Sequence, residues 1–400
     1  MSAAQHTSYD VVIVGGAIYG SSLAWWLTCT AGFAGRVLVV ERDPSYRFAS
    51  TSHTNSCIRQ QFSNLTNIQI SQFGAEFVHN FRQFMGGAPE VPELRLHSFG
   101  YMYLADTPAF AQALKHNQAI QRAAGAQTRH MSRDEIAAAY PFYQLDDIIA
   151  GNHNTHNEGY FDGGTMFDWF KRMARRNGVE YIHDEVTAMG LNAKGTAVET
   201  VTLKSGAVIS CGTVVNASGP RAVATSRMAG IELPVRPRKR YTFVFDAAQP
   251  LAQDLPLTID PTGIHVRTDG RYYMAGCAPD DDVDVAFDDF SFDHSIWQEK
   301  VWPVIATRIP AFEQVKVINE WVGHYAYNTF DQNAVIGRHG IVDNFVFMNG
   351  FSGHGLQQSP ALGRGVAELI AYGEYRTLDL TPFSFSRLER AERFDEKAII

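Results

Sequence analysis

The sequence predicts an α/β protein, α+β overall, with one lobe on a parallel sheet and a second lobe on a mostly antiparallel sheet. Three observations support this fold class. An apolar run at 11–14 leads through a glycine-rich turn into a helical stretch at 21–28 and a second strand at 36–40. Strand-like pieces with one helix fill 231–330. A strand, turn and helix return at 344–372, so we expect the first lobe to be discontinuous in sequence.

The turn after the first strand is typical of a dinucleotide-binding βαβ unit, the Rossmann-like arrangement. Gly15 and Gly20 occupy the outer positions of a G-x-G-x-x-G pattern, while Ala17 stands at the middle position. The second strand ends on Glu41, followed by Arg42. Small residues let the backbone approach a pyrophosphate, a helix N-terminus attracts its charge, and the acid accepts ribose hydroxyls. We therefore expect these five residues to contact a nucleotide.

Composition sets the class of protein. The 400 residues are 45% hydrophobic and 19% charged, which describes a globular chain large enough for two domains. The net charge of -8 comes without a basic stripe, so nucleic acid is not an expected partner. We expect neither an export signal nor a membrane span, since the first ten residues are polar and no long apolar run follows. Scattered cysteines predict no disulfide and no metal site, and favour a cytoplasmic location.

The remaining elements follow from hydrophobic spacing. Apolar residues at helical spacing predict a core-facing helix at 68–84, an amphipathic helix at 108–124 and a short helix at 132–140 with a capping box of Ser132 and Glu135. Further helices are expected at 165–177, 293–308 and 359–372. The predicted strands are 96–104, 180–183, 186–191, 197–203, 207–210, 214–215, 241–245, 263–267, 271–275 and 344–348.

Two charged clusters allow more than one interpretation. The basic cluster Arg236, Arg238, Lys239 and Arg240 is read as local site chemistry or a solvated edge. The acidic run 280–289 could hold a hard cation, but it lacks the glycine and glutamate spacing of a calcium loop, so a solvated loop is favoured.

Three stretches together resemble the D-amino acid oxidase/sarcosine oxidase family of flavoproteins: 9–20 with Glu41, 216–219, and the Gly-Phe-Ser-Gly-His-Gly-Leu run at 350–356. The stretches 58–63, 237–241, 327–337 and 350–360 look most like the branch with dimethylglycine dehydrogenase-type enzymes and the mitochondrial FAD oxidoreductase-domain assembly factor of respiratory complex I. The resemblance implies noncovalent FAD. It also implies an FAD-binding domain at 1–90, 151–230 and 331–400, and a substrate-binding domain at 91–150 and 231–330.

The resemblance adds further cofactor contacts. The hydroxyl-rich loop Ser50, Thr51, Ser52 and His53 lies where the family binds the FAD phosphates, although an ordinary helix cap is the competing account of these hydroxyls. The turn that begins the last helix would lie beside the flavin pyrimidine, where a positive helix end favours the reduced ring. The further expected FAD contacts are Val186, Ala217, Gly219, Gly353, His354, Gly355 and Leu356.

The catalytic candidates follow from what amine oxidation needs. A cation must hold the substrate carboxylate, and Arg59 is the first choice, with Arg267 as the second. Tyr325 and Tyr327 share one face of a strand and His324 takes the other, so we expect only one set to line the pocket, and we favour the tyrosines. Gln357 completes the candidate set.

Departures from the family pattern concern electron disposal. His324 stands where sarcosine oxidases carry the cysteine that binds flavin covalently, which excludes attachment through sulfur. The family's lysines fall on Gln357 and Met274, and its histidine falls on Ala278. The resemblance therefore implies an FAD-dependent dehydrogenase that oxidises the C-N bond of a small secondary or tertiary amine or N-methyl amino acid, with an unknown electron acceptor. A peroxide-forming oxidase and a flavin-containing assembly or interaction protein with little turnover stay open.

Overall fold

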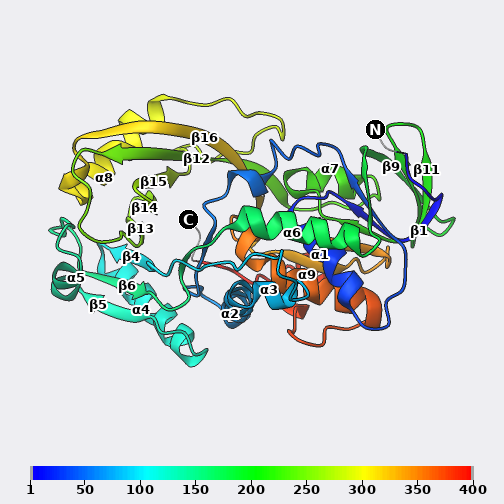
Figure 1. Ribbon diagram of the computed structural model, residues 1–400, viewed down its shortest axis with the longest axis horizontal. Coiled ribbons are helices and arrows are strands. Elements are labelled where there is room, and N and C mark those ends of the chain that lie inside the picture. The colour runs from blue at the N-terminus through cyan, green and yellow to red at the C-terminus, as the bar shows by residue number, and fades with distance from the viewer. Residues whose placement is uncertain (1–2, 398–400) are drawn as a thin grey trace.

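Two lobes, each built around an eight-stranded sheet, make up the computed structural model, which describes residues 3–397 (Figure 1). In Figure 1 the lobe with helices α1, α6 and α9 lies on the right, and the lobe with strands β4–β6 and β12–β16 lies on the left. The predicted fold class is confirmed. The first sheet draws its strands from 8–41, 180–216 and 335–349, so this lobe is discontinuous in sequence, as expected.

The first sheet is parallel at its centre. Its order is β17-β18-β11-β1-β2-β8, with only β17 antiparallel to its neighbour, and β9 and β10 form an antiparallel extension from β11. Val14, at the end of β1, pairs with both Val40 and Asn216, so three neighbouring strands end at the same level. The strands are β1 (Ser8–Val14), β2 (Val37–Glu41), β8 (Glu180–His183), β9 (Val186–Leu191), β10 (Val198–Leu203), β11 (Val208–Asn216), β17 (Val335–Arg338) and β18 (Phe345–Asn349).

Three helices cover one face of this sheet. α1 (Ile18–Cys29) packs against both α6 (Gly163–Arg176) and α9 (Gly355–Tyr372). The α1–α9 approach is close, since a Cβ on Gly363 would lie 2.2 Å from the Ser22 hydroxyl. This explains why α1 carries no charged residue and is apolar on nearly all sides.

One predicted helix is interrupted. The structure replaces the continuous helix expected at 68–84 by α2 (Leu65–His79) and α3 (Phe81–Phe84), because Asn80 leaves the helical region at φ -107° and ψ 22°. The aromatic side chains of both pieces still pack into one core. Hydrophobic spacing predicted the buried face correctly but not the break.

The second sheet is antiparallel except where β13 runs parallel to β4. Its longest strands, β12 and β16, cross the top of Figure 1 toward the other lobe. The order is β16-β12-β15-β14-β13-β4-β6-β5. The strands are β4 (Tyr101–Ala105), β5 (Arg129–Ser132), β6 (Ala150–Asn154), β12 (Val235–Ala247), β13 (Leu257–Ile259), β14 (His265–Asp269), β15 (Tyr272–Cys277) and β16 (Val315–Asn328).

Shorter elements complete the fold. The capping box of Ser132 and Glu135 at the start of α5 (Arg133–Ala139) is confirmed, and α4 (Pro108–Ala123) matches its prediction. The helix expected at 293–308 divides into a π-helical turn (Trp297–Val301) and α8 (Trp302–Arg308). The other helices and strands are β3 (Cys57–Ile58), β7 (Gly159–Tyr160), α7 (Ala222–Arg227) and α10 (Ser386–Glu389). The 3-10 turns are η1 (Ser50–His53), η2 (Gly219–Arg221), η4 (Pro310–Phe312) and η5 (Thr381–Phe383). Between residues 3 and 397, no helix is both long and apolar enough to cross a bilayer.

Candidate functional site

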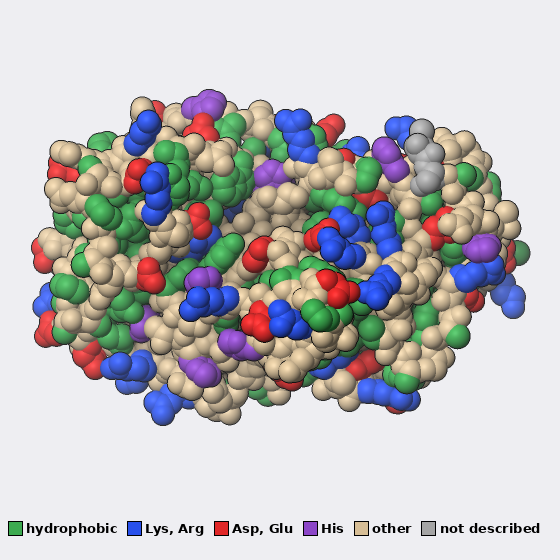
Figure 2. Space-filling view, viewed as in Figure 1, with side chains coloured by type: hydrophobic (Ala, Val, Ile, Leu, Met, Phe, Trp, Pro, Cys, Tyr) green, Lys and Arg blue, Asp and Glu red, His purple; other side chains and the backbone are tan. Residues whose placement is uncertain are grey.

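A cavity of about 900 Å³ lies between the lobes and is lined by residues of both. Figure 2 shows a recess at this place, with Lys and Arg side chains gathered near it. Its walls come from the carboxyl ends of β1, β2 and β11, from the start of α9, and from strands β12, β14 and β16 of the second sheet. The carboxyl edge of a parallel sheet is where open α/β folds bind ligands.

The glycine turn forms one end of the cavity. Gly15 has φ +99°, and a Cβ there would lie 2.6 Å from the Ala217 carbonyl oxygen, so no larger residue fits. Ala17 lines the cavity at the N-cap of α1, where its backbone is extended and its methyl group is tolerated. Gly20 does not line the cavity; a Cβ there would lie 1.9 Å from the Gly15 oxygen, so this glycine is needed for packing of the helix on the strand.

Glu41 holds the glycine turn through hydrogen bonds to its backbone. Its Oε2 accepts a hydrogen bond from the Gly16 N–H at 2.8 Å, and its Oε1 accepts one from the Asp43 N–H at 2.8 Å. Burial raises the pKa of this carboxyl, while the two backbone donors oppose the shift. Arg42 lines the cavity next to Glu41 and is ion-paired to Glu185 at 3.7 Å.

The hydroxyl-rich loop lies across the start of α1. Thr51 Oγ1 accepts a hydrogen bond from the Ile18 N–H at 3.3 Å, and Ser50 donates to the His324 carbonyl at 2.6 Å. Neither hydroxyl caps its own 3-10 turn, but Thr51 accepts from the first N–H of α1, so the helix-cap account holds in part for Thr51. Ser50, Thr51 and His53 line the cavity, whereas Ser52 points away and donates to the Tyr46 carbonyl at 2.8 Å.

The start of α9 forms a further part of the cavity wall next to α1, where the Tyr19 hydroxyl donates to the Gly355 carbonyl at 2.7 Å. Gly353, His354, Gly355 and Leu356 all line it, and no side chain of the described residues caps this helix. A helix N-terminus carries unpaired N–H groups and a partial positive charge. Gly353 has φ +96°, and its missing Cβ leaves room for the Tyr325 ring. Two long helices, α1 and α9, therefore begin at the same cavity.

Three more predicted contacts line the cavity near the glycine turn. Val186 begins β9, and Ala217 and Gly219 follow the end of β11; all three are cavity-lining residues. Gly219 has φ +56°, which suits glycine in the tight turn that leads into α7. These positions agree with the sequence expectation, while their contacts with a cofactor stay predictions.

Arg59 is buried in the wall near the start of α9. Its side chain is 3% exposed and its guanidinium lies 3.1 Å from His354 Nε2 and 4.6 Å from the Phe62 ring centre. The Arg59 N–H donates to Gln357 Oε1 at 2.8 Å. Because a guanidinium only donates, His354 Nε2 accepts this hydrogen bond. Gln357 thus acts as a clamp on the Arg59 backbone as well as a cavity-lining residue.

Two catalytic candidates lie outside the cavity lining. Arg267 is 2% exposed, ion-paired to Asp269 at 2.9 Å, and donates to the Asn55 carbonyl at 3.0 Å. Tyr327 packs against Arg238, whose guanidinium lies 4.3 Å from the ring centre. The structure therefore brings Arg59, Tyr325 and Gln357 together and leaves Arg267 and Tyr327 in supporting positions.

The expectation that only one face of the His324–Tyr327 strand reaches the pocket is wrong. Both His324 and Tyr325 are cavity-lining residues, as are their neighbours Gly323 and Ala326. The His324 ring stacks on Phe290 at 4.2 Å, and its Nε2 donates to the Asp289 carbonyl at 2.8 Å. Burial lowers the pKa of His324, so the ring is neutral at pH 7.

A histidine that sequence reasoning missed lies in the same wall. His265 is two residues before Arg267 on β14 and lines the cavity, with its Nε2 3.0 Å from the Asn55 amide nitrogen. Gly276 on the neighbouring strand leaves room for the ring, since a Cβ there would lie 2.6 Å from Nε2. Burial, together with three nearby arginines, lowers the His265 pKa to about 4. The alternation of the strand would have identified it as a candidate.

The two charged clusters meet in the structure. Arg240, a cavity-lining residue, pairs with Asp282 at 2.7 Å, and Arg238 lies 3.4 Å from the same carboxylate. Lys239 pairs with Asp289 at 2.9 Å. The acidic loop is largely exposed, as the prediction of a solvated loop expects, but ion pairs also hold it against β12. It contributes Phe287, Asp288 and Phe290 to the cavity wall. Among the described residues, no group of three or more His, Cys, Asp or Glu side chains could hold a metal ion.

The site fits a flavin dinucleotide. The cavity is at the upper end of the size range of small-molecule sites. The α1 turn would hold the pyrophosphate with Gly15, Ala17 and Thr51, and the α9 turn would hold the flavin pyrimidine with Gly353 and Gly355. The N-cap residue of neither helix makes a side-chain cap hydrogen bond, although Thr51 accepts the Ile18 N–H, so the remaining N–H groups of both helix starts favour negative charge.

Comparisons with known proteins give the same answer. The FAD-dependent oxidoreductase domain-containing protein 1 of Xenopus laevis is 38% identical over 98% of this chain and 85% of its own length. Human mitochondrial sarcosine dehydrogenase is 22% identical over 91% of this chain and 40% of its own length. The crystal structure of L-proline dehydrogenase from P. horikoshii superposes with a TM-score of 0.82 at 25% identity, covering 96% of this chain and 99% of that one. Glycine oxidase from Geobacillus kaustophilus gives 0.80 at 19% identity, covering 96% and 99%.

The family model described as DAO, FAD dependent oxidoreductase, matches residues 10–369. This match spans both lobes and every cavity-lining element described above. The chain belongs to the DAO family of FAD-dependent oxidoreductases, and FAD is its cofactor.

Proposed function

We propose that this protein oxidises the C-N bond of a small secondary or tertiary amine that carries a carboxylate, such as an N-methyl amino acid. The observation that carries the proposal is Arg59, a buried guanidinium beside the α9 turn of the cavity. A planar guanidinium can bind both oxygens of a carboxylate at once. Similar proteins are named for proline, glycine and iminodiacetate, all amines with a carboxylate one carbon away.

The residues would orient the substrate rather than act as acids or bases. Arg59 would hold the carboxylate, while Tyr325 and Gln357 would bound the space next to it. The substrate carbon would lose a hydride and a secondary nitrogen would lose its proton, giving an imine that water hydrolyses to a carbonyl compound and an amine. Bound FAD supplies the two-electron acceptor. Positioning the C–H bond is the main contribution of the protein.

Flavin reduction tests the reaction class. Purified FAD-loaded protein is mixed without oxygen with sarcosine, dimethylglycine, L-proline, glycine and iminodiacetate, and flavin absorbance is followed. Bleaching by one of these amines is expected. If none bleaches the flavin while another protein co-purifies, the alternative of a flavin-containing assembly protein is favoured instead.

Arginine variants test the anchor. Arg59→Ala should keep FAD but weaken the substrate about ten- to a hundredfold, since a charge-assisted hydrogen bond contributes about 1.5–3 kcal/mol. Arg59→Lys should recover part of the affinity, because a point charge replaces a bidentate fork. Arg172→Ala, which alters an exposed arginine on α6, is the matched control. Unchanged substrate dependence in Arg59→Ala would remove this residue from the site.

We also propose that oxygen is a poor electron acceptor for this protein, and that FAD is bound noncovalently. Gln357 and Met274 are uncharged at the two positions where the resembling oxidases carry lysine. Photoreduced protein should therefore reoxidise slowly in aerated buffer and quickly with an artificial acceptor. Rapid second-order reoxidation by oxygen would support the oxidase alternative. Acid precipitation should release the flavin into the supernatant.

A further inference from the structure

Glu158 is a buried carboxyl group that the proposed function leaves unused. It lies between β6 and β7 and is 0% exposed. Its Oε1 accepts hydrogen bonds from the Gln60 N–H at 2.7 Å and from the Asn154 amide at 2.9 Å, and its Oε2 accepts one from the Gln61 amide at 2.9 Å. Glu158 therefore binds the two residues that directly follow Arg59.

The backbone around Arg59 is held from three directions. Gln357 of α9 accepts a hydrogen bond from the Arg59 N–H, and Ser71 of α2 donates one to the Arg59 carbonyl. Glu158 accepts the next N–H along the chain, that of Gln60. Because each partner comes from a different element, removing one leaves a buried backbone group without a partner and loosens the position of the guanidinium.

We propose that Glu158 is a positioning residue that holds Arg59 in place and takes up one proton from solvent when a carboxylate binds to Arg59. This inference rests on the proposed function, in which Arg59 anchors the substrate carboxylate. The charges of Glu396 and Glu158 both act on Arg59, so ionised Glu158 contributes to balancing the arginine charge. A bound carboxylate supplies that balancing charge instead, so the second negative charge becomes unfavourable and Glu158 accepts a proton.

The neighbouring amide can accommodate either protonation state. Gln61 Oε1 is buried without a hydrogen-bond partner in the described structure, while its Nε2 donates to Glu158 Oε2. Rotation of this amide by half a turn would place Oε1 opposite Oε2, where it would accept the hydrogen bond of a protonated acid. The proton would therefore be bound without loss of a hydrogen bond at Oε2, while the longer hydrogen bond from Gln61 Nε2 to the Tyr101 carbonyl, at 3.3 Å, would be given up.

The environment of Glu158 places its proton uptake near neutral pH. Burial raises the Glu158 pKa to about 7. Hydrogen bonds from the Gln61 side chain, the Gln60 backbone and the Asn154 side chain oppose this rise, as does the charge of Arg59. Tyr101 and Tyr103 face the same space from β4, but burial raises the pKa of both phenols, so they stay neutral. The carboxylate of Glu396, from the C-terminal segment, also acts on Arg59.

Two variants separate charge from position. Glu158→Gln is neutral at every pH and can still accept from the Gln60 N–H, so it imitates the protonated state. Glu158→Ala removes the hydrogen bonds as well. Each FAD-loaded protein is titrated with pyrrole-2-carboxylate between pH 6 and 9 through the change in flavin absorbance. The uncharged pyrrole-2-carboxamide serves as the control probe.

In the wild-type protein the Kd of the carboxylate should rise with pH above 7, by up to tenfold per unit, because binding takes up one proton. In Glu158→Gln the Kd should be independent of pH and close to the wild-type value at pH 6. In Glu158→Ala it should be at least tenfold higher at every pH. If the Kd rises with pH equally in the wild type and in Glu158→Gln, and Arg59→Ala still loses binding, the inference about Glu158 is overturned while the proposed anchor stands. Unchanged binding in Arg59→Ala would instead overturn the proposed anchor.

Discussion

Single small residues in the turns before α1 and α9 decide whether a ligand can approach the backbone there. At Gly15 and Gly353 a positive φ and a close neighbour leave no space for a side chain. At Ala17 the situation is different, because φ is -68° and any residue can adopt this backbone. Ala17 is therefore the position where nucleotide binding can be changed without strain in the fold.

Ala17→Asp should give a folded protein that lacks FAD. Aspartate is a favourable N-cap and should stabilise the start of α1 by about 0.5–2 kcal/mol, while its charge repels the pyrophosphate. Flavin content after purification and the melting temperature of the flavin-free protein are the two readouts. Ala17→Gly, which restores the usual middle glycine, is the control and should retain FAD. A normal flavin content in Ala17→Asp would contradict the assignment of the pyrophosphate to this turn.

Glu158 should give the stability of the protein a distinctive pH dependence. Its folded pKa is raised from 4.5 to about 7, so between these pH values the folded state binds more protons than the unfolded state. Stability then falls as pH rises through this window, by roughly 3 kcal/mol for this group alone. His265 has the opposite sign, since its lowered pKa makes stability rise from about pH 4 to 6.5.

The comparison with Glu158→Gln isolates the effect of the carboxyl group. Urea unfolding at pH 5 and pH 7.5 should show that the wild type loses stability relative to Glu158→Gln as the pH rises, while the His265 contribution cancels. Parallel pH dependence in the two proteins would show that Glu158 ionises as easily in the folded state as in the unfolded chain.

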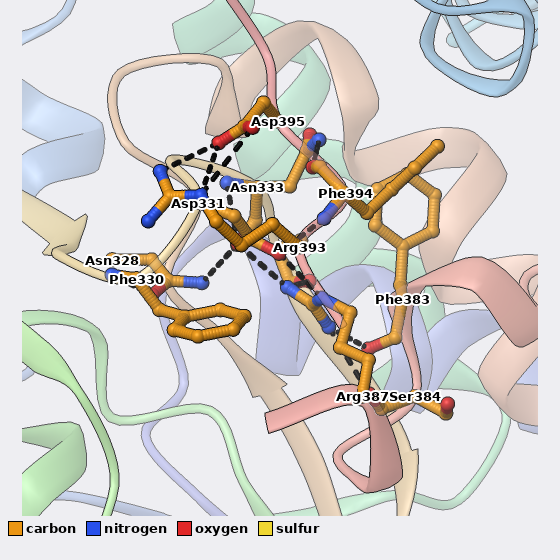
Figure 3. A network of polar contacts seen from close by, with 12 residues as sticks. Asn328, Phe330, Asp331, Asn333, Phe383, Ser384, Arg387, Arg393, Phe394 and Asp395 are labelled. Atoms are coloured by element: carbon orange, nitrogen blue, oxygen red, sulfur yellow. Dashed lines mark hydrogen bonds and ion pairs between the residues drawn. The ribbon is translucent and has the colours of Figure 1, made fainter. Parts of the chain in front are cut away.

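Among the elements, the C-terminal segment is joined to both sheets by a buried polar network (Figure 3). Arg387 of α10 binds Asp331 through two hydrogen bonds, at 2.6 and 3.0 Å, and the Phe394 N–H donates to the same carboxylate. Asp331 follows β16 and lies before β17, so one carboxylate ties together a strand of each lobe and the last helix. The sequence motif at 327–337 is thus structural.

Asp331→Ala should destabilise the protein by about 3–5 kcal/mol, because it leaves the Arg387 charge buried without its partner. Asp395→Ala breaks the ion pair with Arg393, also drawn in Figure 3, whose side chains are 34% and 52% exposed, and should cost well under 1 kcal/mol. Urea unfolding measures both. If Asp331→Ala fails to accumulate, Asp331→Asn keeps some hydrogen bonds and should show a smaller loss. Equal effects of Asp331→Ala and Asp395→Ala would contradict the role of the network.

For the whole molecule, the cavity connects the two lobes, since Gly15 and Glu41 of the first lobe and Arg240 and His265 of the second line the same space. A ligand that fills this cavity binds only the folded arrangement of both. Cofactor binding is therefore coupled to the stability of the entire chain. The cytoplasmic location stays a prediction, because the four free cysteines of the structure do not test it.

Removing FAD should lower the melting temperature, and adding it back should raise it with concentration. At a free FAD concentration a hundredfold above Kd the gain is about 2.7 kcal/mol. With an unfolding entropy of about 2.1 cal/mol/K per residue, this corresponds to a shift of about 3 °C for a chain of this length. Thermal unfolding followed by circular dichroism measures it. A melting temperature independent of FAD would contradict binding across both lobes.

The sequence by itself determined the features that depend on neighbouring residues. The glycine turn with Glu41, the α9 turn, the two kinds of sheet and the capping box at Ser132 all follow from spacing, turn chemistry and local hydrogen bonding, and the structure places them as expected. A backbone turn needs the same residue types wherever it occurs. This is why the fold and a dinucleotide site could be predicted together, whereas the family resemblance implied that the dinucleotide is FAD.

Only the tertiary structure decided which side chains meet across long distances. The pairing of Asp282 with Arg240 and the contact of Glu158 with the residues after Arg59 depend on strand register and on how the lobes pack. Shifting a strand by one residue would turn every side chain to the other face, and spacing along the chain does not specify that register. Local chemistry therefore determined the nucleotide-binding framework, whereas packing determined the environment of the proposed substrate anchor.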